Sequence, residues 1–267
     1  NNIYIGGKVK LIDFPHHYDY KDLRFSPKNL KKKFNDLGWD NIVAFQTRNP
    51  LHKAHVEMTL KALDDLDANL LIHPVVGMTK AGDVDHYTRV RCYQHVLNKY
   101  PQNKAILSLI PLAMRMGGPR EALWHAIIRK NYGCTHLIVG RDHAGPGLNK
   151  EGNPFYGPYD AQEMLQKFEE EIGIKMVPFK FLVYLPDENI YKPIDEISND
   201  TNYKTVSGTE LRDYLDKGKD IPEWFTYKDV AKELQKSRPP ISKRGFTIFF
   251  TGSVSYTHLT LPTTPYV

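Results

Sequence analysis

The sequence from Asn41 to His55 is NIVAFQTRNPLHKAH, and its character changes in the middle. Residues 41–45 form an apolar run with the length of a buried strand, whereas residues 54–66 carry apolar side chains at helical spacing. A strand that leads through a loop into a helix is the repeating unit of an open α/β sheet, and ligands bind at the carboxyl ends of such strands. We therefore expect a binding site in the polar loop between these two elements.

The polar residues of this loop suit an anion. Arg48 offers a planar guanidinium with five donors, and Gln46 and Asn49 add neutral donors. The following helix N-terminus adds free backbone N–H groups and a partial positive charge. His52 and His55 stand three residues apart, so both rings face one side of the first turn. A zinc site is disfavoured because the sequence has no HExxH pattern and no carboxylate at a suitable spacing.

Each of these features has a more ordinary explanation when it is taken alone. A histidine pair at this spacing is more often a surface or helix-cap feature, and a single arginine after a strand is usually a solvated charge. The functional interpretation rests on their convergence within ten residues at one strand-to-helix corner.

A second loop of the same kind follows the apolar run THLIV at residues 135–139. It has the sequence GRDHAGPG, Gly140 to Gly147, and again combines arginine and histidine after a strand. Its glycines allow the backbone to approach a ligand closely. An ordinary glycine-rich turn is the alternative interpretation.

Together, QTRNPLHKAH and GRDHAGPG resemble the corresponding motifs of the ATP sulfurylases, or sulfate adenylyltransferases, and the resemblance extends over about residues 1–250. Lys53 stands where arginine is common in the family, which keeps the charge. The resemblance implies an α/β fold, a Rossmann-like parallel sheet of the HxGH nucleotidyltransferase type with a small C-terminal helical subdomain. It also implies the reaction of ATP with sulfate to adenylylsulfate (APS) and pyrophosphate. This is the first step of sulfate activation, or the reverse reaction in sulfur oxidation, and the sequence leaves the direction open.

The resemblance assigns roles to residues of both loops. Sulfate would be held by Gln46, Arg48 and the backbone N–H of Ala144, while His52 and His55 would stabilise charge in the transition state. The implied catalytic residues are Thr47, Arg48, Asn49, His52 and His55. The implied ATP-binding residues are Gln46, Arg48, Asn49, His52, His55, Gly140, Arg141, Asp142, His143 and Leu182, the last through its backbone at the adenine. No protein metal site is expected, and Mg²⁺ would arrive as MgATP.

Beyond Asn41, strand and helix patterns alternate along the chain. Strands are expected at 41–46, 69–76, 104–110, 135–139 and 175–184, and helices near 53–66, 84–100, 118–132 and 159–171. This alternation predicts a parallel sheet with helices on both faces and right-handed crossovers. Within the helix near 84–100, we expect Asp83 as the cap and surface ion pairs for Arg89 and Arg91.

Five parts are predicted along the chain. Residues 1–25 are expected to be the remnant of an N-terminal β-rich domain, and residues 26–200 the catalytic α/β domain. Residues 201–237 would form the small helical subdomain, in which Ser207 and Glu210 have capping-box spacing. Residues 238–253 resemble a linker and the first strand of a truncated adenylylsulfate kinase domain, but the Gly-Lys-Ser/Thr of a phosphate-binding loop is missing. Residues 254–267 resemble translated sequencing-adapter DNA and are expected to be a non-native tail.

Composition narrows the class of protein. The chain has 267 residues, of which 41% are hydrophobic and 25% charged, and its net charge of +5 suits small anionic substrates but does not indicate nucleic acid. No run of eighteen apolar residues occurs, so no membrane segment is expected. Cys92 and Cys134 lie in apolar-periodic segments, which favours buried thiols in a reducing, cytoplasmic compartment. A homo-oligomer is expected from the resemblance. The start at Asn1, with neither Met nor a signal peptide, suggests a chain cut from a longer parent.

Two other functions stay open at this point. One is an HxGH adenylyltransferase that uses another acceptor, which an absence of sulfate or molybdate dependence would reveal. The other is a non-catalytic nucleotide-binding fragment, which would bind ATP without turning it over.

Overall fold

A five-stranded parallel sheet forms the centre of the computed structural model, which describes residues 6–8, 10–13, 15–77, 82–245 and 247–248. The strand order is β3-β2-β1-β4-β5. The strands are β1 (Ile42–Phe45), β2 (Asn69–Ile72), β3 (Ala105–Leu107), β4 (His136–Val139) and β5 (Lys175–Pro178). The chain first moves outward from β1 to β3 and then returns to β4 on the other side of β1. The sheet order therefore reverses between β1 and β4, and the predicted Rossmann-like fold is confirmed.

Helices cover both faces of the sheet. Successive strand residues point to opposite sides, so one strand contributes apolar side chains to both faces. In β1, Val43 and Phe45 belong to one apolar cluster, together with residues of α2 (Lys53–Leu66) and α3 (His86–Leu97). Ile42 and Ala44 belong to a second cluster on the other face. That cluster includes residues of α1 (Pro27–Asp36), α4 (Pro119–Asn131) and α5 (Asp160–Lys167), and α5 is followed by the short α6 (Glu169–Ile172). Full burial on both faces explains why the central strands are continuous apolar runs.

The expected fifth strand, 175–184, is wrong, because the segment forms two strands in different sheets. Pro178, which has no N–H to donate, ends β5, and the chain then leaves the main sheet. β6 (Leu182–Leu185) instead pairs antiparallel with β7 (Ile190–Pro193) to form a separate hairpin. The helix expected near 159–171 is present as two consecutive helices, α5 and α6. The helix expected near 53–66 is confirmed as α2 with these bounds, and the other expected strands and helices are present with shorter ends.

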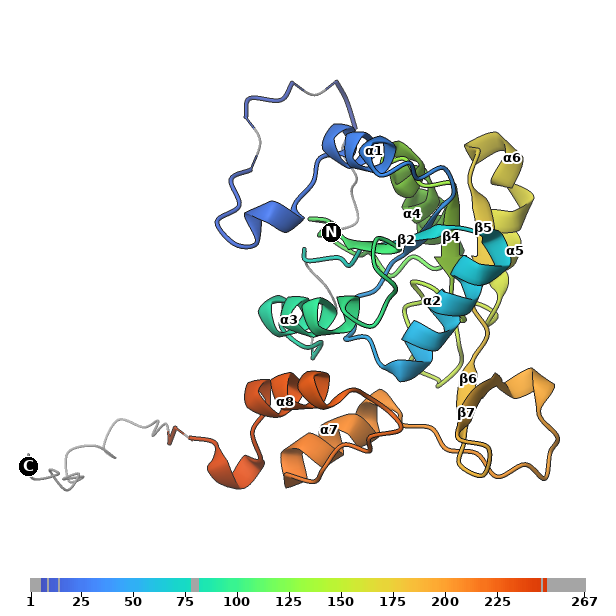
Figure 1. The fold of residues 1–267 in the computed structure, drawn as a ribbon. Coiled ribbons are helices and arrows are strands. Elements are labelled where there is room, and N and C mark those ends of the chain that lie inside the picture. The colour runs from blue at the N-terminus through green and yellow to red at the C-terminus, as the bar shows by residue number, and fades with distance from the viewer. Residues whose placement is uncertain (1–5, 9, 14, 78–81, 246, 249–267) are drawn as a thin grey trace, which may run out of the picture.

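Two helices follow this hairpin, α7 (Gly208–Lys217) and α8 (Lys228–Ser237), and in Figure 1 they lie together on one side of the sheet. The predicted capping box of α7 is confirmed, because Ser207 and Glu210 each bond the other's backbone N–H. Leu211, Leu215, Val230 and Leu234 belong to the same apolar cluster as Val43 and Phe45 of β1. These helices therefore share a hydrophobic core with the sheet. Short 3-10 turns complete the described chain at Lys21–Leu23, Ile194–Glu196 and Ile241–Lys243.

Three smaller expectations have clear outcomes. Arg91 forms the expected ion pair, with Glu233 of α8. Asp83 does not cap α3, since the side chain of Asp85 accepts from the backbone N–H of Thr88 at 2.9 Å. Cys92 and Cys134 are free and buried, as expected. In the described ranges, none of the helices combines the length and apolar character of a membrane span. The predicted tail, residues 254–267, lies outside the described residues.

Candidate active site

The two sequence motifs meet at the carboxyl ends of neighbouring strands. The first follows β1 and the second follows β4, on either side of the point where the sheet order reverses. A cavity of about 300 Å³ lies between them. It is lined by ten of the predicted residues, Gln46, Thr47, Arg48, Asn49, His55, Gly140, Arg141, Asp142, His143 and Ala144. His52 and Leu182 are not part of this lining, whereas Phe179 is.

Helix α3 holds the backbone of the first motif from outside. Tyr93 Oη donates to the carbonyl of Asn49 at 2.9 Å, and Arg89 Nη1 donates to the carbonyls of Arg48 at 2.9 Å and Val75 at 3.0 Å. Arg89 is only 2% exposed, so the expected surface ion pair for this residue is wrong. A guanidinium is suited to this place because its Nη1 carries two N–H groups, which can serve the two carbonyls at once.

Within the motif, Thr47 closes a turn. Its Oγ1 donates to the carbonyl of Asn49 at 2.9 Å and accepts from the N–H of Asn49 at 3.0 Å. The hydroxyl of Thr47 is therefore engaged with the backbone, and its role here is to shape the loop that presents Arg48 and Asn49.

Arg48 is oriented by an ion pair with Asp83, the residue expected to cap α3. The side chains of Arg48 and Asp83 are 22% and 12% exposed, so the pair is partly shielded from water. Such shielding strengthens the attraction and fixes the arginine at the cavity wall. Any anion that binds Arg48 does so beside this carboxylate.

The two histidines of the first motif are neutral at pH 7. Burial lowers the pKa of His55 to about 4. Burial, and then the neighbouring His55, hold the pKa of His52 well below its usual range. The backbone N–H of His52 donates to Nδ1 of His55 at 3.1 Å, so neutral His55 carries its proton on Nε2. Nδ1 of His52 lies 3.0 Å from Oγ1 of Thr226.

A buried chain of side chains from α4 connects the two motifs. His125 Nδ1 lies 3.1 Å from His143 Nε2. The other ring nitrogen of His125, Nε2, lies 3.3 Å from a carboxylate oxygen of Glu121 and 3.4 Å from Gln46 Nε2. Glu121 also accepts from the N–H groups of Arg115 at 2.8 Å and Gly117 at 2.7 Å. We call Glu121, His125, His143 and Gln46 the α4 network.

Glu121 is the charged member of the α4 network at pH 7. Burial by itself raises the pKa of this carboxyl, but the hydrogen bonds from His125 and from the backbone of Gly117 and Arg115 lower it to about 2. Burial lowers the pKa of His125, and burial with the nearby His125 and Arg129 lowers the pKa of His143 to about 3. The network is therefore one carboxylate with two neutral imidazoles.

The same network indicates how the amide of Gln46 is turned. A proton on His125 Nε2 that is donated to Glu121 leaves no lone pair there for an amide N–H. The Oε1 atom of Gln46 is buried and has no hydrogen-bond partner among the described residues. The orientation of a side-chain amide follows from its hydrogen-bond partners. Turning the amide places its oxygen toward His125 and its NH₂ group at the present position of Oε1.

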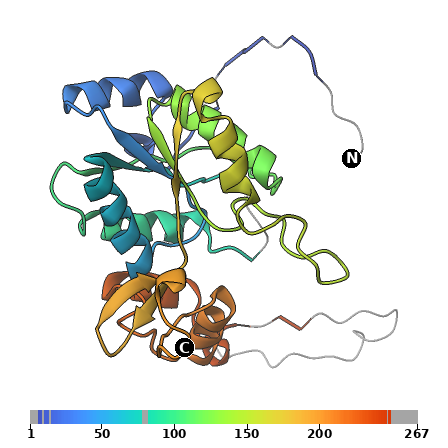
Figure 2. The same cartoon turned by 90° about the vertical axis from the view of Figure 1, so that its right-hand side faces the viewer.

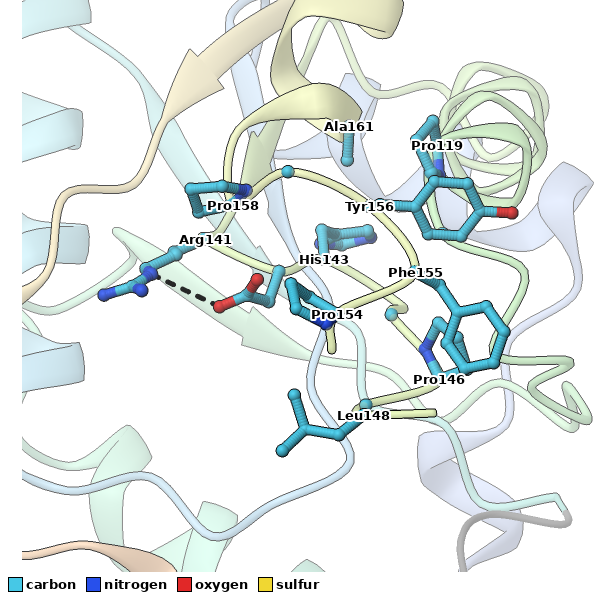
Figure 3. Close-up of a pocket in the computed structure, with 15 residues that line it drawn as sticks. Pro119, Arg141, His143, Pro146, Leu148, Pro154, Phe155, Tyr156, Pro158 and Ala161 are labelled. Atoms are coloured by element: carbon cyan, nitrogen blue, oxygen red, sulfur yellow. Dashed lines mark ion pairs between the residues drawn. The ribbon is translucent and has the colours of Figure 1, made fainter. Parts of the chain in front are cut away.

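A second cavity of about 400 Å³ adjoins the first and shares Arg141, Asp142 and His143 with it (Figure 3). The long loop between β4 and α5 forms its wall and projects from the sheet in Figure 2. In Figure 3, Phe155 and Tyr156 lie at one end and Arg141 lies at the other. Arg141 forms an ion pair of 3.3 Å with Asp142. This cavity is largely apolar, in contrast to the polar cavity between the motifs.

The backbone of the second motif is strained where it meets the cavity. Asp142 and Ala144 have φ angles of 52° and 53°, in the left-handed region that non-glycine residues rarely adopt. The hydrogen bond from Gly118 N–H to the Ala144 carbonyl, at 2.9 Å, holds this shape. Strain of this kind concentrates at ligand sites, where it aims backbone N–H groups.

A third cavity of about 400 Å³ lies between the first motif and α7. Asn49 and His55 line both this cavity and the one between the motifs, and His52 lines this one. The N-terminus of α7 contributes Ser207, Gly208 and Arg212. The histidines therefore stand between the two cavities.

Several residues of the site were missed by sequence reasoning: Asp83 as an ion-pair partner, Arg89, Tyr93, Glu121, His125 and Thr226. The only sequence pattern that could have indicated one of these contacts was in α4, where Glu121 and His125 stand at i, i+4 beside apolar residues. Among the described residues, no group of three or more His, Cys, Asp or Glu side chains is arranged to hold a metal.

The family model for ATP-sulfurylase matches residues 21–237 of the chain. The sulfate adenylyltransferase of Phaeosphaeria nodorum is 58% identical over 249 residues, which is 93% of this chain and 43% of that protein. The sulfate adenylyltransferase of Coccidioides immitis is 59% identical over 252 residues, 94% of this chain and 44% of that protein.

A solved structure described as a hexameric APS kinase from Thiobacillus denitrificans has a TM-score of 0.73 and 31% identity, and covers 89% of this chain and 44% of that one. This chain thus spans less than half the length of the curated relatives it matches. The match of the family model over most of the chain establishes that it belongs to the ATP sulfurylase family.

Proposed function

We propose that this chain carries the sulfate adenylyltransferase site, which converts ATP and sulfate to adenylylsulfate and pyrophosphate. The observation that carries the proposal is the convergence of QTRN and GRDHA on one cavity at the reversal point of the sheet. The similarity to proteins named sulfate adenylyltransferase supports the choice of sulfate as acceptor. The proposal concerns the residues of this chain, which spans less than half the length of those relatives.

Sulfate is assigned to the wall formed by Gln46, Arg48 and Ala144. Arg48 supplies the charge, the turned amide of Gln46 supplies neutral donors, and the backbone N–H of Ala144 comes from the strained loop. Sulfate is already ionised and needs no general base. Catalysis then consists of positioning and stabilising charge.

ATP is assigned to the remaining lining residues. Arg141 and Asn49 bind its phosphates, Gly140, Asp142 and His143 contact it from the second motif, and the backbone near Leu182 approaches the adenine. His52 and His55 stabilise charge as it moves to the leaving pyrophosphate, during in-line attack at the α-phosphorus without a covalent intermediate. Their lowered pKa values fit neutral N–H donors, which do not hold the product by a full ion pair.

The proposal also covers the metal ion, the cellular compartment and the oligomeric state. Mg²⁺ enters with its substrate as MgATP, where it shields the phosphates that Arg141 and Asn49 bind. We also propose a cytoplasmic homo-oligomer. The free buried thiols Cys92 and Cys134 support the compartment, and the hexameric state named for the solved relative supports the oligomer.

The test of the proposal is ATP formation from adenylylsulfate and pyrophosphate with Mg²⁺, read by luciferase. Arg48→Ala should lower turnover by about 10²–10³-fold, as expected for loss of one donor that stabilises developing charge. Arg120→Ala is the matched control, because Arg120 is exposed on α4 and lines none of the three cavities.

The possible results separate the alternatives. Turnover that Arg48→Ala abolishes and Arg120→Ala preserves supports the sulfurylase site. ATP binding without turnover would identify an inactive nucleotide-binding fragment. ATP cleavage that does not depend on sulfate or molybdate would indicate another acceptor and overturn the proposal.

A further inference from the structure

The loop between α7 and α8 reaches the first turn of α2. Thr226 Oγ1 lies 3.0 Å from Nδ1 of His52, and the two residues are 174 positions apart in the sequence. The carbonyl of Phe225 accepts from the N–H of Lys53 at 3.2 Å, and its ring lies 4.2 Å from the His52 ring. Thr226 is 2% and His52 7% exposed. This loop therefore encloses one side of the His52 imidazole.

The loop is itself held in a defined shape. The carbonyl of Pro222 accepts from the N–H groups of Phe225 at 3.0 Å and Thr226 at 3.3 Å. Trp224 stacks on Tyr184 of β6, with ring centroids 5.0 Å apart and an angle of 8°. Tyr191 of β7 donates its hydroxyl to the carbonyl of Trp224. The β6–β7 hairpin thus buttresses the loop that contacts His52.

The two histidines differ in what fixes their ring protons. A backbone N–H, which can only donate, bonds Nδ1 of His55, so that the proton of the neutral ring must lie on Nε2. The Nδ1 atom of His52 instead faces the Thr226 hydroxyl, which can donate or accept. The ring nitrogen left for a ligand in the third cavity is Nε2.

We propose that Thr226 is a positioning residue, whose hydroxyl donates to Nδ1 of His52 and thereby holds the ring proton on Nε2. Both histidines then present N–H donors of the same kind, one set by its own helix and the other by a distant loop. This inference rests on the proposed function, in which His52 stabilises charge on the phosphates. It adds that the loop after α7 completes the donor set of the first motif.

Loss of the Thr226 hydroxyl should act on turnover more than on binding. A neutral histidine with its proton on Nδ1 offers Nε2 as an acceptor, which repels a phosphate oxygen as charge builds up. We expect Thr226→Val to lower kcat about 10–100-fold, the range found when the partner that orients a functional histidine is removed. KM should change far less, because Arg48, Asn49 and Arg141 still bind the substrates.

The experiment compares three variants with the unaltered chain. Thr226→Val removes the hydroxyl at nearly constant volume, and Thr226→Ser restores it. Thr59→Val is the matched control: Thr59 is fully buried on α2 and its hydroxyl bonds backbone carbonyls and Tyr100, not an imidazole. Kinetics of ATP formation are measured beside ¹⁵N–¹H spectra of histidine-labelled protein, which report the tautomer of each ring, with His52→Gln for assignment.

The expected result has two parts. His52 is the Nε2–H tautomer in the unaltered chain, in Thr226→Ser and in Thr59→Val, and shifts toward Nδ1–H in Thr226→Val, where kcat falls. An unchanged tautomer in Thr226→Val overturns the inference, as does an Nδ1–H tautomer in the unaltered chain. If the unaltered chain makes no ATP, the proposed function fails for this chain, whereas the spectra still decide the role of Thr226.

Discussion

Glu121 shows how a single buried carboxylate organises neutral groups around the site. It is 4% exposed, and its oxygens accept from two backbone N–H groups and lie beside His125. His125 in turn contacts His143 of the second motif and Gln46 of the first. At the scale of residues, the two motifs are therefore coupled through side chains of α4, not through the cavity alone.

We predict that Glu121→Gln impairs both stability and activity. An amide NH₂ would replace an oxygen that now accepts from Gly117 or Arg115, so one backbone N–H loses its partner. The expected cost in unfolding free energy is about 1–3 kcal/mol, measured by urea denaturation at pH 7. Turnover should fall as well, because His125 no longer has a carboxylate that fixes its proton on Nε2 and so orients Gln46.

The pKa of Glu121 determines how the effect of this substitution on unfolding free energy changes with pH. The pKa of Glu121 is lowered in the folded state to about 2, below the unfolded value of 4.5. Its contribution to stability is therefore present above pH 4.5 and lost as the pH falls from there toward 2. The stability gap between the variant and the unaltered chain should close over that window. Glu163→Gln, an exposed change on α5, is the control and should show no gap; an equal gap at all pH values would contradict the assignment.

At the scale of elements, α3 acts as a support for the first motif. Its inner side places Arg89 and Tyr93 against backbone carbonyls of Arg48, Asn49 and Val75. Its N-terminal flank carries Asp83, which orients Arg48. One helix therefore fixes both the backbone of the QTRN loop and the direction of its arginine.

We predict that Tyr93→Phe loosens this loop while the fold persists. The lost hydrogen bond should lower the unfolding free energy by about 1 kcal/mol. Because small displacements of binding groups have large kinetic effects, turnover should fall by up to about 100-fold. Tyr87→Phe is the matched control on the same helix, since its side chain is 50% exposed. Equal activities of the two variants would show that Tyr93 only packs.

The sequence predicted the strands and their motifs, but it did not predict the side-chain contacts that support them. Apolar runs of four or five residues followed by polar loops predicted β1, β4 and their motifs, because burial on both faces leaves a direct mark on composition. The split of 175–184 was missed because the apolar pattern continues through Pro178 into β6. The roles of Asp83 and Arg89 were missed because Arg48, which both contact, is 35 and 41 residues away from them, and hydrogen bonds over such separations leave no period in the sequence.

At the scale of the whole molecule, the site depends on segments from most of the chain. Thr226 and His52 are 174 residues apart, and Gln46 and His125 are 79 residues apart. The sequence motifs located the carboxyl ends of β1 and β4, and the parallel topology then brought these loops together, as expected. The interior network that joins them could not be derived, since it depends on which buried polar groups face one another after packing.

Buried histidines are a further property of the whole fold, and they make it sensitive to mild acid. Burial lowers the pKa of His52, His55, His73, His125 and His143 below the usual 6.5. Below pH 6.5 the unfolded chain therefore binds protons that the folded chain does not, so stability must fall as the pH falls. Each such histidine contributes a slope of about 1.4 kcal/mol per pH unit once the unfolded ring is protonated.

His73 allows this account to be tested away from the site. It is fully buried beside Tyr132, and burial together with the charge of Arg129 holds its pKa well below the usual value. We predict that His73→Phe reduces the slope of unfolding free energy against pH, between about pH 6 and 5, by close to one proton, about 1.4 kcal/mol per pH unit. His16→Phe, which removes a side chain that is 76% exposed, should leave the slope unchanged. Urea denaturation at several pH values measures both, and an unaltered slope in His73→Phe would mean that the folded protein accepts a proton at His73 as readily as the unfolded chain does.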